Sequence, residues 1–163
     1  MIQPPEPLTA EHALGGFDSG VASLDHWLRR RALQNQTSGA SRTFVVCDEA
    51  AVVAYYVLAA SAVAADAAPG RFRRNMPDPI PVVVLARLAI TRDHQGRGLG
   101  RALFQDSAKR VIHAADAIGI RGLLVHAISE EAKAFYVRLG LGPSPLDPMN
   151  LMTTVADLKA ALG

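Results

Sequence analysis

The chain has 163 residues, of which 50% are hydrophobic and 20% are charged, so it fits one folded domain and is not globally disordered. Its single cysteine, Cys47, excludes an internal disulfide and favours a reducing compartment. No basic segment followed by an apolar one opens the chain, and the longest uncharged stretch, residues 50–65, is too short to span a bilayer. We therefore expect a cytoplasmic protein without a membrane anchor.

Arginine accounts for 14 of the 17 basic residues, although the net charge is only +2. Two clusters are prominent, Arg29–Arg31 and the group Arg71, Arg73 and Arg74. A guanidinium group makes planar, two-point contacts with phosphate or carboxylate. The clusters are therefore either solvated surfaces or contacts for a nucleic acid, and both interpretations stay open at this point.

The first half of the chain predicts a helix, a hairpin and a long connection. Apolar residues at helical spacing predict an amphipathic helix over 22–35. Two β-branched and aromatic runs, 43–47 and 52–58, flank an acidic turn and predict a hairpin. Prolines and a glycine over 66–81 predict an exposed connection.

The second half alternates strands with helices. Apolar runs predict buried strands, and 3.6-residue periodicity predicts helices between them. In chain order these are a strand over 80–90, a helix over 98–118, a strand over 122–127, a helix over 129–139, a strand over 150–155 and a C-terminal helix. This succession predicts an α/β fold, a mixed central sheet flanked by helices, as one domain over residues 1–163.

A glycine-rich turn separates the strand over 80–90 from the long helix. Its residues are Gln95, Gly96, Arg97, Gly98, Leu99, Gly100 and Arg101. Backbone N–H groups are free at the start of a helix, the helix dipole attracts anions there, and glycine permits close approach of a ligand. The turn therefore predicts a cradle for a pyrophosphate.

Two other interpretations of this turn have to be weighed. The dinucleotide signature G-x-G-x-x-G needs a third glycine where the chain has Arg101. The acid at the expected spacing, Asp116, lies inside the predicted helix rather than at the end of a strand. A turn with a purely structural role is the second alternative.

The pattern Gln95-x-x-Gly98-x-Gly100 after an apolar strand resembles the acetyl-coenzyme-A motif of the GNAT superfamily of N-acetyltransferases. From about Leu8 to Leu162 the chain also resembles one subgroup, the GNAT toxins of bacterial toxin–antitoxin modules of the TacT/AtaT type. The segments that carry this resemblance are 19–28, 41–45, 88–90, 125–127, 134–136 and 143–152. One departure, Leu141 where the family usually has Phe, keeps the position apolar.

The resemblance implies a single-domain GNAT fold and an acetyl-CoA-dependent enzyme that uses no metal. Such toxins acetylate the α-amine of aminoacyl-tRNA and thereby stop translation. The resemblance further implies a ribbon-helix-helix antitoxin that neutralises the toxin, and a homodimer. The alternative is a GNAT enzyme acting on a protein N-terminus, a ribosomal protein or a small-molecule amine, and a third hypothesis is a non-enzymatic acetyl-CoA sensor.

The resemblance also assigns residues to the chemistry. Tyr136 is expected to donate a hydrogen bond or a proton to the departing thiolate, which suits a phenol with an ordinary pKa near 10. Ser129 either caps its helix or touches the pantetheine arm, and Phe135 packs against the cofactor. The expected cofactor-binding residues are Leu88, Ala89, Ile90, Gln95, Gly96, Arg97, Gly98, Leu99, Gly100, Arg101, Ser129 and Phe135.

The same reasoning places the tRNA on basic residues. Arg87, an arginine inside an apolar strand, is either structural or lines the acceptor site, because a buried arginine needs a partner. Trp27 is expected in the core. His126 falls in a predicted buried strand and is expected in the core as well, with a general base as the alternative interpretation. The expected tRNA contacts are Arg29, Arg30, Arg71, Arg73, Arg74 and Arg87.

Overall fold

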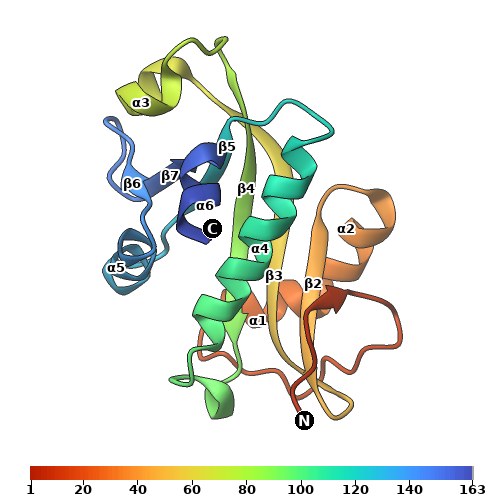
Figure 1. Cartoon of the computed structure of the whole chain (residues 1–163). Coiled ribbons are helices and arrows are strands. Elements are labelled where there is room, and N and C mark those ends of the chain that lie inside the picture. Colours follow the sequence, from red (N-terminus) through yellow and green to blue (C-terminus); the bar gives the residue numbers. More distant parts are fainter. Residues whose placement is uncertain (163) are drawn as a thin grey trace. The chain divides into compact units, whose positions relative to one another are not determined.

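The computed structural model describes residues 1–162 (Figure 1). Its strands and helices are, in chain order, β1 (Glu6–Pro7), α1 (Ala22–Arg30), α2 (Ala32–Ser38), β2 (Arg42–Asp48), β3 (Ala51–Val63), η1 (Ala65–Ala67), α3 (Gly70–Arg73), β4 (Ile80–Ile90), η2 (Arg92–His94), α4 (Leu99–Ala115), β5 (Gly122–His126), α5 (Glu130–Arg138), β6 (Gly142–Pro143), β7 (Asn150–Thr154) and α6 (Val155–Leu162). The expected strands and helices are present, except that two helices, α1 and α2, replace the single helix expected over 22–35, and the structure adds the short elements β1, η1, α3, η2 and β6.

The strands form a mixed sheet of seven in the order β1-β2-β3-β4-β5-β7-β6. The pair β4–β5 is parallel, whereas β1–β2, β2–β3, β5–β7 and β6–β7 are antiparallel. A parallel pair needs a long crossover, and α4 lies between β4 and β5 in the chain. The prediction of an α/β fold with a mixed sheet flanked by helices is confirmed.

Two compact units share this sheet. The first consists of Met1–Ala59 with Ala86–Ser107, and the second of Ala60–Leu85 with the residues from Ala108 onward. The elements β3, β4 and α4 run through both.

Helices cover both faces of β3 in the first unit. Tyr55 Oη donates a 2.6 Å hydrogen bond to the carbonyl of Leu24 in α1, and Tyr56 Oη donates a 2.5 Å bond to Asp106 Oδ2 in α4. Neighbouring residues of a strand point to opposite faces, so α1 and α4 lie on opposite sides. The core on the α1 side consists of Leu8, Phe17, Leu28, Ala32, Val45, Cys47, Val52, Tyr55, Val57 and Ala89.

The single helix expected over 22–35 is in fact two helices. The backbone bends at Arg31, whose φ of −123° departs from helical values, and α2 continues to Ser38. Arginine is a good helix former, so local propensity gives no signal for this bend. The second helix ends at Gly39, whose φ of 84° fits a left-handed C-cap.

In the second unit β5 is the central strand between β4 and β7. Gly122 opens β5, where an added Cβ would collide with the carbonyl oxygen of Thr153 and lie 2.8 Å from Phe72 Cε2. Only a residue without a side chain allows this close approach of β7. The surrounding core consists of Ala68, Phe72, Ile80, Val82 and Met152.

Within the described residues, no helix is both long enough and apolar enough to cross a bilayer.

Candidate active site and nucleic-acid interface

Gln95 connects the glycine-rich turn of the first unit to the end of β4 by hydrogen bonds. Its Nε2 atom donates to the carbonyls of Ile90 at 2.8 Å and of Ser19 at 2.9 Å. Its backbone N–H donates to Arg92 at 3.2 Å. All the N–H groups of Gln95 are therefore used inside the protein, and this residue holds the turn in place.

The two glycines that follow leave their backbone open to a ligand. Gly96 and Gly98 have φ angles of 77° and 79°, which favour glycine, and no atom lies within 4 Å of the position of an added Cβ at either residue. Directly after them α4 begins at Leu99, and the first N–H groups of a helix have no acceptor inside it. Arg97 and Arg101 are exposed beside this turn. Open glycines, free helical N–H groups and positive charge fit a pyrophosphate.

The last residues of β4 supply an extended backbone before the turn. Ala89 is 5% exposed and packs into the core on the α1 side, whereas Leu88 and Ile90 are only half-buried. The alternation of a strand therefore turns Leu88 and Ile90 to the other face. The role of these three residues in holding the pantetheine arm stays a prediction.

The short helix α5 of the second unit carries the candidate catalytic residue. Ser129 caps this helix by accepting a hydrogen bond from the N–H of Ala132 at 3.0 Å, as the sequence predicts. Tyr136 lies in the last turn and is 7% exposed, with the ring of Phe135 packed edge-on at 5.0 Å. Burial raises the pKa of Tyr136 to about 12, so the phenol is protonated at neutral pH.

The two other tyrosines are occupied in the core. Tyr55 and Tyr56 are completely buried, and their hydroxyl groups donate to α1 and α4 respectively. Burial raises the pKa of Tyr55 far above its ordinary value. Neither residue is accessible to a substrate, and the catalytic role of Tyr136 stays a prediction.

His126 does not belong to the core, contrary to the sequence prediction. It is the last residue of β5 and is exposed, and its Nδ1 atom lies 2.6 Å from Asn150 Oδ1. The alternation of the strand buries Val125 and directs the next side chain outward.

The arginines that are expected to contact a nucleic acid differ in whether their guanidinium groups are already bonded within the protein. Arg29 donates to the carbonyl of Phe17 at 2.9 Å. Arg71 forms a two-point ion pair with Asp157, at 2.6 and 3.0 Å, which raises the pKa of Arg71 and lowers that of Asp157. By contrast, three of the expected arginines are exposed and make no hydrogen bond or ion pair within the described residues: Arg30, Arg73 and Arg74.

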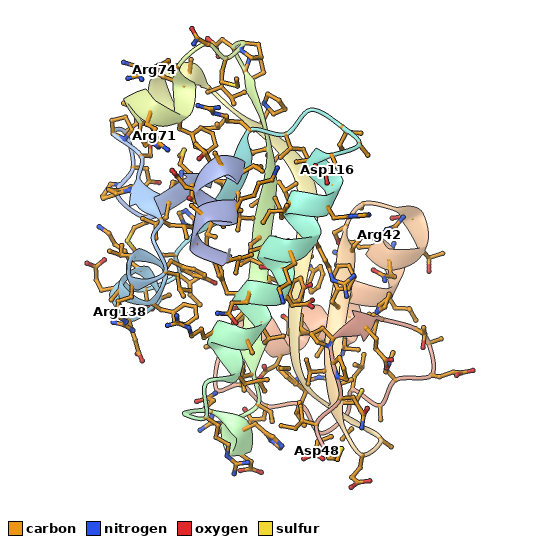
Figure 2. The ribbon with its side chains drawn as sticks, viewed as in Figure 1. Arg42, Asp48, Arg71, Arg74, Asp116 and Arg138 are labelled. Atoms are coloured by element: carbon orange, nitrogen blue, oxygen red, sulfur yellow. The ribbon has the colours of Figure 1, made fainter. Side chains whose placement is uncertain are left out.

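Arg121 is a basic residue that the sequence reasoning missed. Its guanidinium donates to the carbonyls of Phe72 at 2.8 Å and of Arg71 at 2.7 Å, which holds α3 against the start of β5. A single arginine before a strand belongs to no motif, so the sequence does not indicate its contacts with α3. Arg121 lines a cavity of about 280 Å³ with residues of α3, the segment after it, β7 and α6, namely Arg71, Arg74, Asn75, Met76, Thr154 and Ala156. Figure 2 labels Arg71 and Arg74 at α3.

One group of metal-ligand types lies in the first unit, formed by Glu6, His12 and Cys47. Internal hydrogen bonds already occupy the imidazole: Nε2 lies 2.7 Å from Glu6 Oε1, and Nδ1 accepts the N–H of Thr9 at 2.9 Å. Burial raises the pKa of the Cys47 thiol, which disfavours the thiolate that a metal requires. We assign no metal to this group.

Comparison with known proteins identifies the family. Residues 39–140, more than half of the chain, match the acetyltransferase (GNAT) domain. The chain belongs to the GNAT family of acetyltransferases. The turn from Gln95 to Arg101 lies within the matched region, so the geometry described above belongs to an acetyltransferase domain.

The relatives include toxins that act on tRNA. The chain is 52% identical over 147 residues to the tRNA-acetylating toxin of Mycobacterium tuberculosis (strain H37Rv), an alignment that covers 90% of this chain and 89% of that protein. The structure matches AtaT complexed with acetyl-methionyl-tRNAfMet with a TM-score of 0.92, 30% identity and complete coverage of both chains. A Tyr-to-Phe mutant of AtaT, bound to acetyl-CoA and to the C-terminus of the antitoxin AtaR, matches with a TM-score of 0.84, 29% identity and coverage of 98% and 97%. This GNAT protein is therefore a homologue of tRNA-acetylating toxins.

Proposed function

We propose that this protein is an acetyl-CoA-dependent toxin that acetylates the α-amine of aminoacyl-tRNA and so blocks translation. The observation that carries the proposal is the 52% identity to a tRNA-acetylating toxin along nine-tenths of the chain. An acylated amine cannot attack in peptide-bond formation. We further propose that the protein acts in the cytoplasm as a homodimer, and that a ribbon-helix-helix antitoxin neutralises it.

Acetyl-CoA, when bound, supplies the acetyl group as a reactive thioester. The turn holding Gly96 and Gly98 would bind its pyrophosphate through backbone N–H groups, with Arg97 and Arg101 adding positive charge. The extended backbone of Leu88–Ile90 would hold the pantetheine arm. Gln95 acts on this site indirectly, because its amide orients the turn.

Tyr136 would hold its proton toward the leaving sulfur. The pKa of this phenol is raised to about 12, whereas that of a free thiol is about 8.5. Complete transfer of the proton is therefore unfavourable, and a hydrogen bond that strengthens as negative charge grows on the sulfur is the favoured role. Phe135 packs against this ring and limits its orientation.

The proposed acceptor needs little help from a base. An α-amine has a pKa of about 7.7–8.0, and the adjacent ester lowers it further, so a large fraction is neutral at physiological pH. A lysine ε-amine, with a pKa of about 10.4, would require strong deprotonation. The chemistry therefore favours an α-amine over a protein lysine.

Exposed arginines would hold the acceptor stem by its phosphates. Arg73 and Arg74 at α3 are the strongest candidates there, because the neighbouring Arg71 is already paired with Asp157. On the α1 side Arg30 is unpaired, whereas Arg29 is bonded to Phe17. Phosphate contacts fix position without reading sequence, so these residues do not select the tRNA.

The test is transfer of labelled acetyl groups from acetyl-CoA to total aminoacyl-tRNA, compared with deacylated tRNA, lysine-containing peptides, peptides with a free N-terminus, ribosomal proteins and small amines. Labelling of aminoacyl-tRNA alone, with loss of the label when the ester is hydrolysed, is the expected result. Labelling of a protein N-terminus, a ribosomal protein or a small amine instead would establish the alternative acceptor.

A further inference from the structure

Arg87 is a half-buried cation in β4 whose charge has no acidic partner. Its guanidinium carbon lies 4.3 Å from the centre of the Trp27 ring, in a cation–π contact. Within residues 1–162 the side chain makes no hydrogen bond and no ion pair. An aromatic face offsets part of the cost of removing a cation from water, but it does not satisfy N–H donors that lie in the guanidinium plane.

Trp27 is itself held in place by the core. Its ring stacks on Tyr55 at 6.2 Å with an interplanar angle of 9°, and Phe17 packs edge-on against Tyr55 at 5.5 Å. The hydroxyl of Tyr55 is bonded to the carbonyl of Leu24. The ring fixes the position of the guanidinium carbon 4.3 Å above it, and a guanidinium that stacks on an aromatic face keeps its N–H donors at its edge, where a ligand can reach them.

The position of Arg87 in the chain connects it with the proposed chemistry. It directly precedes Leu88–Ile90, the residues expected to hold the pantetheine arm, and it shares a strand face with Ala89, which packs on the α1 side. The preferred ligand of a planar guanidinium with free N–H donors is a phosphate or carboxylate bound at two points.

We propose that Arg87, oriented by Trp27, binds a phosphodiester of the 3′-terminal nucleotides of the acceptor. This inference rests on the proposed acetylation of aminoacyl-tRNA, because that acceptor must bring its 3′ end to the thioester. A phosphodiester carries the anionic oxygens that match the guanidinium fork, whereas an amino acid ester offers only neutral carbonyls. Trp27 is a positioning residue, because it acts through the orientation of Arg87.

The first experiment removes one charge at a time from the ligand. A labelled acceptor-stem RNA hairpin ending in CCA is prepared with a neutral methylphosphonate at each of its 3′-terminal linkages in turn, and the dissociation constant is measured for wild type and Arg87→Met. At one linkage the methylphosphonate should weaken binding to the wild-type protein by about tenfold. Arg87→Met should bind that RNA no more weakly than it binds the unmodified RNA, since the two changes remove the same contact. If each methylphosphonate weakens binding to Arg87→Met as much as it weakens binding to the wild-type protein, the proposal is overturned.

The second experiment tests the role of Trp27 through a split between KM and kcat. Trp27→Leu should raise the KM for aminoacyl-tRNA by about fivefold and leave the KM for acetyl-CoA unchanged, whereas Trp27→Phe should restore most of the affinity. In an Arg87→Met background Trp27→Leu should have no further effect on this KM. Lys109→Met removes an exposed cation from α4, outside the proposed tRNA contacts, and is the matched control for charge. Additive effects of the two substitutions would reduce Trp27 to a structural role and overturn this part of the proposal.

The outcomes separate this site from the proposed function. Arg87-dependent binding of the hairpin without any acetyl transfer would keep the site and reject the proposed reaction. Transfer to aminoacyl-tRNA with unchanged binding and kinetics in Arg87→Met would reject the site and keep the reaction. If Arg87→Met transfers acetyl groups normally but escapes neutralisation by the antitoxin, the ligand is an acidic peptide and the phosphate proposal is overturned.

Discussion

The side-chain amide of Gln95 donates a 2.8 Å hydrogen bond to the carbonyl oxygen of Ile90, which links the glycine-rich turn to the end of β4. This hydrogen bond fixes the chain direction immediately before Gly96 and Gly98, the two residues with positive φ. The direction of the turn is therefore set by contacts within the protein. A backbone held by internal contacts loses less conformational freedom on binding.

Gly98→Glu should abolish the stabilisation of the protein by acetyl-CoA. A ligand present at about 100 times its Kd stabilises the folded state by about 2.7 kcal/mol, which appears as a rise in Tm. A carboxylate at this open position would repel the pyrophosphate. Gly39→Glu is the matched control, because Gly39 also has a positive φ, of 84°, but lies at the end of α2. A normal rise in Tm for Gly98→Glu would place the cofactor elsewhere.

Tyr136→Phe should lower kcat by about 100-fold or more, the usual effect of losing one hydrogen-bond donor to charge that develops in the transition state. The change removes one hydroxyl and keeps the ring, so the packing against Phe135 persists. Single-turnover transfer to aminoacyl-tRNA measures the loss, and the acetyl-CoA-dependent rise in Tm verifies that the variant still folds and binds. Wild-type rates in this variant would exclude Tyr136 as the donor.

The pH dependence of kcat/KM should show a single ascending limb between pH 5.5 and pH 9. Its midpoint should follow the α-amine of the substrate, at about pH 7.7 or lower. Tyr136 acts in its protonated form, and since its pKa is raised to about 12, the donor is lost only far above this range. A decline above pH 8 would contradict the assignment, and a midpoint near 10 would indicate a lysine acceptor.

The double variant Arg73→Ala/Arg74→Ala should weaken the use of all susceptible aminoacyl-tRNAs alike. Each phosphate contact contributes about 0.9 to the slope of log affinity against log salt, so losing one or two contacts flattens the slope by about that amount for each. The measurement is kcat/KM across a salt series, with the KM for acetyl-CoA as a control. Wild-type slopes would show that these arginines are solvated.

Asp157→Asn makes the opposite change at the same surface. Loss of this carboxylate frees Arg71 and raises the local positive charge. The KM for aminoacyl-tRNA should therefore fall by about twofold at low salt, an effect typical of an exposed ion pair, and the gain should vanish at high salt. An increase in KM would indicate that the ion pair itself shapes the tRNA surface.

Gly122→Ala should destabilise the fold by about 3 kcal/mol, because its Cβ would collide with the backbone of β7. Gly119→Ala is the control, since no atom lies within 4 Å of the position of its Cβ, and it should leave stability unchanged or raise it by about 0.5 kcal/mol. Urea denaturation monitored by circular dichroism measures both. If the two variants have equal free energies of unfolding, β7 moves away from the added Cβ at little energetic cost.

The features that sequence reasoning predicted correctly depend on neighbours in the chain. The strand over 80–90 matches β4 residue for residue, because a continuous apolar run gives an unambiguous signal. A helix cap is one of the two roles that the sequence leaves open for Ser129, and Ser129 accepts the N–H of Ala132. The glycine-rich turn was identified in the same way, from its place between a strand and a helix.

The partner of each arginine could not be predicted from the sequence. Arg71 finds Asp157 at a separation of 86 residues, and Arg87 finds the ring of Trp27 in α1 rather than an acid. His126, expected in the core, lies exposed beside Asn150 because of the register between β5 and β7. Such pairings depend on how strands and helices pack, and no local pattern encodes them.

The sequence by itself determined the order of strands and helices and the position of the glycine-rich turn, since hydrophobic periodicity and local hydrogen bonds fix these within a few residues, and its motifs indicated the family. Only the tertiary structure decided which cations are available to a ligand. Arg29 and Arg71 are bound to the protein, whereas Arg74 is free and Arg87 rests on an aromatic face. Identical side chains differ in this respect because long-range packing places an acceptor beside some guanidinium groups and not beside others.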